Sequence, residues 1–331
     1  MQSARNIGAG HIDDRLGIRI YIVLVDARLL RLSVRFVWDK RRLRMTTKEL
    51  IRMLTPPLFI RLAKFLRAGS NCPIEWEYVP EGFAYSQTHP EVKGWNVSDV
   101  LATYKEKWPR FVSMVQGTEP LGVTHESELT TSMDIIGHNT IMSFAYALTL
   151  AARHKDRLFV LDWGGGIGHY YLLAKALLPG VEIEYHCKDV PILCEHGAQL
   201  FPQQYFYTDM GCFKRRFDLV LASCSLHYTE DWRTLLQRLA GATGDYLYVA
   251  NLPTVQQCSS FVFIQRSYRY GYNTEYLAWC LNRMEFLDAA ERSGLDLLRE
   301  FVYGHQPLIK SAPEQNVYRG FLFRSRQQGK Q

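Results

Sequence analysis

Val160-Leu161-Asp162-Trp163-Gly164-Gly165-Gly166-Ile167-Gly168 is the stretch that decides the fold of this 331-residue chain. Residues 158–161 form a short apolar run, as in a buried strand, and residues 169–178 have the apolar spacing of a helix. Glycine adopts positive φ angles without strain and lets the backbone approach a ligand closely. The stretch therefore predicts a strand, a ligand-binding turn and a helix, in that order.

Several kinds of ligand-binding loop have this general form, and the spacing of the glycines separates them. A phosphate-binding P-loop needs a lysine after its last glycine, and none follows Gly168. A dinucleotide fingerprint needs G-x-G-x-x-G, but His169 or Tyr171 falls at its last position. The spacing present is D-x-G-x-G-x-G, which disfavours both a P-loop and an NAD-dependent oxidoreductase.

Short apolar runs alternate with helical stretches beyond residue 157. This alternation predicts an α/β fold with a mostly parallel sheet and helices on both faces. The final two strands follow one another without a helix between them, which predicts an antiparallel hairpin at an edge. A helical and irregular region precedes the sheet. We expect strands at 158–161, 181–186, 217–222, 246–250, 297–302 and 318–323, and helices at 48–67, 97–116, 135–153, 169–178, 191–201, 231–241 and 275–293.

The D-x-G-x-G-x-G spacing resembles motif I of class I methyltransferases that use S-adenosylmethionine (SAM), and the resemblance covers about residues 157–326. It implies a Rossmann-like sheet and SAM as the cofactor. The loop would hold the methionine part of SAM. The loop residues concerned are Asp162, Gly164, Gly165, Gly166 and Gly168; Gly165 falls where the family varies.

Three further positions match the cofactor site by resemblance. Asp189 follows the second strand, about 20 residues beyond the glycines, where a carboxylate suits the ribose hydroxyls. Asp209 matches a position near the adenine, although a capping or loop role explains it equally well. Ser223 ends a stretch, residues 217–223, that resembles the fourth strand of the family.

A narrower resemblance covers residues 46–326. The cues include Trp76-Glu77, Asp189-Val190-Pro191 and residues 261–266. They resemble a methyltransferase family found among bacterial surface-polysaccharide biosynthesis genes. This resemblance implies a saccharide or lipid-linked saccharide as the methyl acceptor, whose identity the sequence does not give.

Methyl transfer to a hydroxyl gains from a group that removes the proton. His227 follows the fourth predicted strand, at the end of the sheet where open α/β folds bind ligands, and we expect it to be the base. The alternative is that His227 packs against the cofactor or caps a helix. His305, between the last two strands, is the second candidate. Glu230 and Asp231 are expected to cap the next helix.

Charge is concentrated at the start of the chain. The formal net charge is +6, and residues 1–44, with ten basic and four acidic side chains, account for all of it. The neutral remainder gives no support for nucleic-acid binding. Charges interrupt the apolar stretch 20–37, so a transmembrane segment is not expected. Residues 1–44 are either a basic segment in peripheral contact with a membrane or an appendage before a natural start at Met45.

The seven cysteines are scattered and form no C-x-x-C pair, so no metal site is expected, and reduced thiols suit a cytoplasmic protein. We expect three regions: a basic extension at 1–44, a helical and irregular accessory region at 45–155, and a SAM-binding domain at 156–331. The function expected is O-methylation of a small-molecule or saccharide hydroxyl. The alternative is a non-catalytic SAM-binding sensor or partner subunit. The sequence does not predict the oligomeric state.

Overall fold

The computed structural model describes residues 74–122 and 134–326. These described residues belong to one compact unit. The basic extension 1–44, the start at Met45 and the helix expected at 48–67 lie outside the described residues, so these remain predictions.

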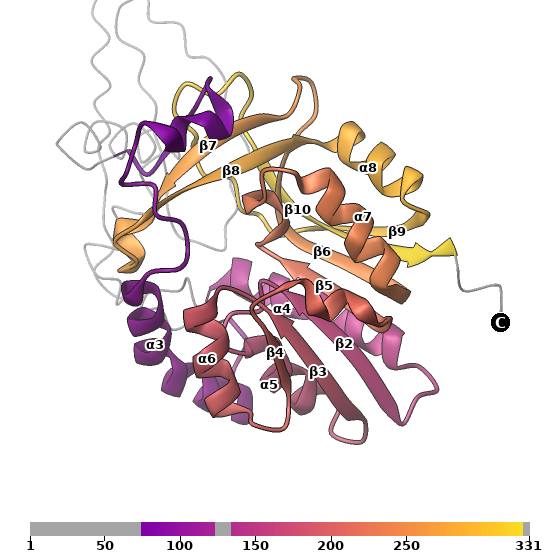
Figure 1. Ribbon diagram of the computed structural model, residues 1–331. Helices are drawn as coiled ribbons and strands as arrows, with labels where there is room; N and C mark the ends of the chain where they lie inside the picture. The colour runs from indigo at the N-terminus through magenta and orange to yellow at the C-terminus, as the bar shows by residue number, and fades with distance from the viewer. Residues whose placement is uncertain (1–73, 123–133, 327–331) are drawn as a thin grey trace, which may run out of the picture. The chain divides into compact units, whose positions relative to one another are not determined.

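Five neighbouring parallel strands form the centre of the sheet (Figure 1). Their order is β4 (Tyr205–Tyr207), β3 (Glu182–Lys188), β2 (Arg157–Trp163), β5 (Phe217–Ser223) and β6 (Thr243–Val255). β2 and β5 read as continuous apolar runs because helices cover both of their faces. The α/β fold with a mostly parallel central sheet and an antiparallel edge pair is confirmed.

The antiparallel strands lie beyond β6. β10 (Val317–Ser325) pairs with β6 and with β9 (Leu295–Val302), which is the predicted hairpin. A second antiparallel group was not predicted: β1 (Trp76–Tyr78), β7 (Phe261–Arg266) and β8 (Glu275–Asn282) pair in that order. The end of β8 runs parallel to the end of β6 and joins this group to the central sheet.

The long helix predicted at 275–293 is wrong. Its first part is β8, and the helix α8 spans only Arg283–Arg292. Asn282 decides the boundary, because its side-chain oxygen accepts hydrogen bonds from the backbone N–H groups of Met284 (2.9 Å) and Glu285 (3.1 Å). Such a cap starts a helix at the next residue. The upstream residues pair with β7, and tertiary pairing overrides their helical spacing.

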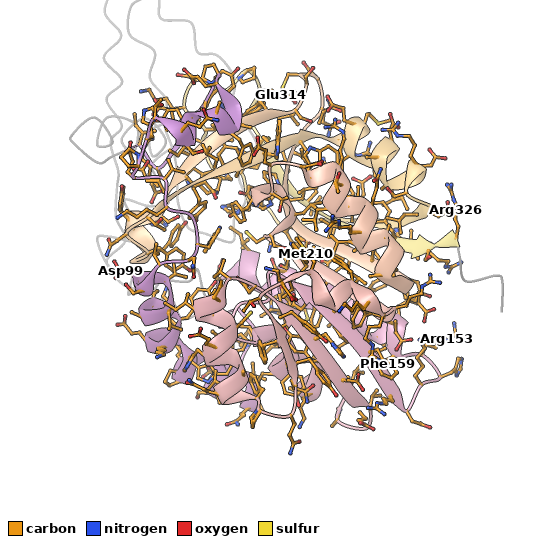
Figure 2. All side chains as sticks on the ribbon, in the orientation of Figure 1. Asp99, Arg153, Phe159, Met210, Glu314 and Arg326 are labelled. Atoms are coloured by element: carbon orange, nitrogen blue, oxygen red, sulfur yellow. The ribbon has the colours of Figure 1, made fainter. Side chains whose placement is uncertain are left out.

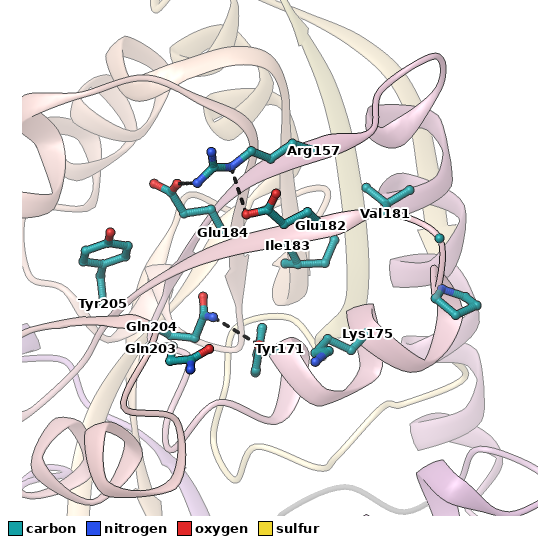
Figure 3. Close-up of a pocket in the computed structure, with 12 residues that line it drawn as sticks. Arg157, Tyr171, Lys175, Val181, Glu182, Ile183, Glu184, Gln203, Gln204 and Tyr205 are labelled. Carbon is teal, nitrogen blue, oxygen red and sulfur yellow. Dashed lines mark hydrogen bonds and ion pairs between the residues drawn. The ribbon is translucent and has the colours of Figure 1, made fainter.

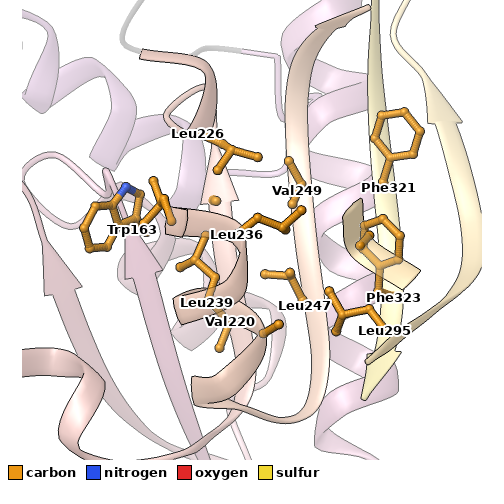
Figure 4. Close-up of a cluster of buried hydrophobic side chains, with 14 of the residues drawn as sticks. Trp163, Val220, Leu226, Leu236, Leu239, Leu247, Val249, Leu295, Phe321 and Phe323 are labelled. Atoms are coloured by element: carbon orange, nitrogen blue, oxygen red, sulfur yellow. The ribbon is translucent and has the colours of Figure 1, made fainter. Parts of the chain in front are cut away.

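Two hydrophobic cores lie on opposite faces of the sheet. Helices α4 (Ile135–Ala152) and α5 (His169–Leu177) pack on one face, with Phe144, Leu148 and Leu173 among the buried side chains. Helices α7 (Trp232–Ala242) and α8 pack on the other, where Leu236 and Leu239 meet the strands (Figure 4). The remaining elements are α3 (Ser98–Gln116), α6 (Pro191–Leu200), and the short helices η1 (Gly82–Gln87), η2 (Met210–Lys214), η3 (Leu226–Tyr228) and η4 (Ser267–Tyr270).

The described part of the expected accessory region belongs to the same compact unit as the sheet. Asn273 donates to Asp99 of α3 (3.0 Å), and Thr103 donates to the carbonyl oxygen of Gly271 (3.2 Å). Figure 2 labels Asp99 on this helix. Among the described residues, α4 is long and apolar enough to cross a membrane by composition, yet half of it is buried in the protein. Its buried face lies in the hydrophobic core, as in a core helix.

Phe286 tests the packing of α8 on the sheet. Its fully buried ring lies 5.0 Å from the ring of Phe321 and 6.1 Å from that of Trp232. Phe286→Ala should lower the free energy of unfolding by about 3–5 kcal/mol, since it leaves a cavity. Met284, 54% exposed on the same helix, is the control, and Met284→Ala should cost less than about 0.5 kcal/mol. Urea titration measures both, and equal losses would contradict this packing.

Candidate functional site

The glycine loop lies between the carboxyl end of β2 and the first residue of α5. Three of its glycines have positive φ: +77° at Gly164, +61° at Gly166 and +100° at Gly168. Residues with a Cβ rarely adopt these conformations. The strand, turn and helix predicted around the loop are confirmed, and the helix begins at His169.

Neighbouring protein atoms occupy the space beside these glycines. A Cβ added at Gly164 would lie 2.3 Å from the Cβ of Ser225, and one at Gly166 would lie 2.9 Å from the ring of Tyr104. At Gly168 the ring of Phe201 would be 2.8 Å away. The loop is therefore packed tightly by α3, the residue after α6 and the segment after β5, which the motif itself does not indicate.

Asp162 is fully buried beneath the loop. Its Oδ2 accepts a hydrogen bond from the Tyr185 hydroxyl (2.5 Å), whereas Oδ1 has no partner among the described residues. Burial raises the pKa of Asp162 to about 7; the Tyr185 bond opposes this rise and the nearby Asp189 adds to it. A buried carboxylate with a spare oxygen is a favourable place for a cation. Sequence analysis did not identify Tyr185.

Asp189 fastens the loop to the end of β3. Its Oδ2 accepts from the N–H of Gly166 (2.7 Å) and its Oδ1 from the N–H of Val190 (2.6 Å). Burial raises the pKa of Asp189, and the two backbone bonds oppose this rise. A carboxylate has about four acceptor positions. Both oxygens can therefore accept a ligand's hydroxyl protons as well.

Asp209 follows β4 and Ser223 ends β5, two strands that β3 and β2 separate in the sheet. Asp209 is exposed and accepts from the N–H of Gly211 (2.8 Å), so it caps η2, the alternative role considered above. Ser223, at the end of β5, shares a hydrogen bond of 2.7 Å with the hydroxyl of Tyr170. Both lie at the carboxyl ends of parallel strands, the edge where such sheets bind ligands.

The two candidate bases contact the same tyrosine. The His227 ring lies 6.4 Å from the ring of Tyr318, and the His305 ring lies 4.7 Å from it. His227 is fully buried in η3, and neither ring nitrogen has a partner in the described part of the chain. Burial lowers the pKa of His227 to about 3 and also lowers that of His305, which Asp134 partly offsets.

Asp231 caps α7 through the N–H of Thr234, as predicted.

A separate hollow of about 440 Å³ lies away from the loop, at the amino ends of β2, β3 and β4 (Figure 3). Arg157 pairs there with Glu182 (3.4 Å) and Glu184. Open α/β sheets bind ligands at the opposite edge. We therefore assign no role to it. Within the described residues no group of three or more His, Cys, Asp or Glu side chains is placed to hold a metal ion.

No family model and no curated protein matches the chain. Solved structures resemble it in part. An S-adenosylmethionine-dependent methyltransferase from Clostridium acetobutylicum is 12% identical, with a TM-score of 0.38 over 56% of this chain and 91% of that one. The 1,6-didemethyltoxoflavin-N1-methyltransferase of Burkholderia thailandensis, solved with S-adenosylhomocysteine, is 16% identical, with a TM-score of 0.38 over 56% of this chain and 79% of that one. Mitomycin 7-O-methyltransferase is 17% identical, with a TM-score of 0.37 over 67% of this chain and 68% of that one.

Gly168 tests how tightly the loop is packed. Gly168→Ala places a Cβ against Phe201 and forces alanine to a φ of +100°, which should cost about 1–3 kcal/mol of unfolding free energy. Gly180→Ala is the matched control, since nothing lies within 4 Å of its Cβ position and its φ is not positive. Chemical denaturation compares the two. A Gly168→Ala protein as stable as the control would show that the loop adopts another conformation.

Proposed function

We propose that this protein is a SAM-dependent methyltransferase acting on a hydroxyl group of a small molecule or saccharide. One observation carries the proposal. The buried carboxylate of Asp162, with an oxygen that lacks a partner among the described residues, lies against a glycine loop at the carboxyl end of β2. SAM carries a sulfonium and an ammonium group, and a buried carboxylate favours such positive charge.

The residues present fit SAM. Asp162 would hold the ammonium group, and the backbone of Gly164, Gly165, Gly166 and Gly168 would surround the methionine part. Asp189 keeps acceptor capacity for the ribose hydroxyls beyond its two backbone bonds. Asp209 and Ser223 are proposed to lie along the adenosine part. When bound, SAM supplies an electrophilic methyl group.

The protein's further task is to position the acceptor and accept its proton. His227 is a candidate because η3 follows the carboxyl end of β5. His305, between β9 and β10, is the second candidate. The lowered pKa keeps His227 neutral at pH 7, and only the neutral form accepts a proton. The same low pKa makes His227 a weak base, so it suits a hydrogen-bond acceptor that orients the hydroxyl better than a site that stores the proton.

The polysaccharide context remains a proposal that rests on the narrower sequence resemblance. The alternative, a SAM-binding sensor or partner subunit without catalysis, would use the same Asp162 and Asp189. Formation of S-adenosylhomocysteine in the presence of saccharide or small-molecule hydroxyl compounds separates the two, because only an enzyme produces it.

SAM and S-adenosylhomocysteine, but not NAD, should bind the purified full chain. Asp189→Ala should weaken binding by about 1.5–3 kcal/mol, the range for a hydrogen bond to a charged group. Glu182, an exposed acid at the other end of β3, provides the control variant Glu182→Ala. Isothermal titration calorimetry measures all three ligands. Binding of NAD without binding of SAM would overturn the proposed function.

SAM affinity should depend on pH through Asp162. Below its pKa of about 7 the side chain is protonated and neutral, and binding a cation then requires release of the proton. Affinity should therefore rise between pH 5 and 7 by up to about tenfold per pH unit, and Asp162→Asn should remove this dependence. Calorimetry in buffers of different ionisation enthalpy counts the released proton. A flat profile for the unmodified protein would exclude this role of Asp162.

A further inference from the structure

Trp95 and His227 carry buried polar atoms for which the described residues offer no hydrogen-bond partner. These atoms are the indole Nε1 and both imidazole nitrogens. A buried polar group without a partner costs free energy, since it has lost water and gained nothing in exchange. Each such group therefore requires an explanation, and a ligand that brings the missing partner is one.

Trp95 and His227, two side chains with such unpartnered atoms, belong to one aromatic cluster. Both rings lie beside Tyr228: the indole centroid is 5.2 Å from it and the imidazole centroid 4.1 Å. Trp95 also stacks on Tyr276 at 4.4 Å and 27°. The Tyr228 hydroxyl donates to the side-chain oxygen of Gln265 (3.0 Å), which fixes the ring between its neighbours. We call Trp95, His227, Tyr228, Gln265 and Tyr276 the Trp95 cluster.

The Trp95 cluster is joined to the glycine loop through one short segment. Ser225 donates to the carbonyl oxygen of Trp163 (2.6 Å) and fills the space beside Gly164. His227 and Tyr228 follow it within η3. The same turn therefore touches the proposed cofactor loop at one end and the Trp95 cluster at the other. An acceptor bound by the cluster would lie beside the cofactor.

The chemistry of the Trp95 cluster favours an uncharged occupant. An indole N–H donates only, and a neutral imidazole has one nitrogen that accepts. The nearby charges are already matched, because Arg266 pairs with Glu77 (3.0 Å) and Glu275 (3.5 Å). Burial lowers the pKa of His227 and removes a positive charge that would attract an anion. A hydroxyl group can accept from an indole N–H and can donate to the accepting nitrogen of an imidazole, and aromatic faces suit a flat ring.

We propose that Trp95 and His227 form a two-point subsite for an uncharged ring bearing hydroxyl groups, with the indole N–H donating to it and the imidazole accepting from it. In the proposed function this ring belongs to the methyl acceptor, so the inference rests on that function. Trp95 and His227 bind the acceptor directly and select a neutral acceptor over an anionic one.

The test follows the indole N–H signals of the full chain with ¹⁵N-labelled tryptophan, with and without S-adenosylhomocysteine. Trp95→Phe identifies the Trp95 signal by its loss. The probes are two neutral rings, phenol and methyl α-D-glucopyranoside, each paired with an anionic relative, benzoate and methyl glucuronoside. At least one neutral probe should shift the Trp95 signal while its anionic relative leaves it in place. A shift of equal size with the anion, or none with either neutral probe, overturns the proposal.

Variants separate this role from a structural one. His227→Phe keeps a buried ring and removes the two unpartnered nitrogens. It should keep or raise the melting temperature, yet weaken binding of the neutral probe about tenfold, the equivalent of one hydrogen bond. Trp279→Phe is the control, since its indole already donates to the carbonyl oxygen of Glu230 (2.9 Å). It should lower the melting temperature and leave probe binding unchanged.

A lower melting temperature for His227→Phe with unchanged probe binding would show that the histidine is structural. Calorimetry on the same samples measures binding of S-adenosylhomocysteine, and so tests the proposed function separately from the proposed subsite. If S-adenosylhomocysteine fails to bind, the proposed function fails, and the titration without it still decides whether a neutral ring reaches Trp95.

Discussion

The hydrogen bond from the Gly166 N–H to Asp189 is the contact on which the site depends. It holds the glycine loop against the end of β3 while α3, the residue after α6 and the segment after β5 fill the space where side chains would be. Neighbours on three segments that are distant in the sequence therefore pack against the loop. α3, which precedes the central parallel strands in the chain, is part of the site for this reason.

The buried Asp162 and the partly buried Asp189 also set the electrostatics of the loop. Burial raises the pKa of both Asp162 and Asp189, because the negatively charged form of each carboxylate loses hydration there. A cation bound nearby would stabilise that charged form. In the proposed function, this arrangement favours a positively charged ligand more directly than the glycine spacing does. It also explains why one buried oxygen of Asp162 can stay without a partner in the described protein: a ligand would supply the missing interaction.

The sequence predicted the parts of the fold that are coded locally. No distant contact is needed to predict β2 and β5 from their apolar runs. The same is true of the turn predicted from the glycine pattern between β2 and α5. β8 was misread as helix because its apolar spacing fits both periods, and only pairing with β7 decides between them. Tyr185, Ser225 and Tyr104 were missed for the same reason, since their roles depend on which strands and helices become neighbours. His227 was found from its place after β5, but its burial, which lowers its pKa, was not predictable from sequence.

Hydrogen–deuterium exchange in the presence of S-adenosylhomocysteine tests the location of the site most directly. The account predicts slower exchange in peptides that cover 162–171 and 187–193, where the loop and Asp189 lie, with no change at 179–184 and 203–205 around the separate hollow. Protection confined to the hollow, with the glycine loop exchanging as in the free protein, would contradict it.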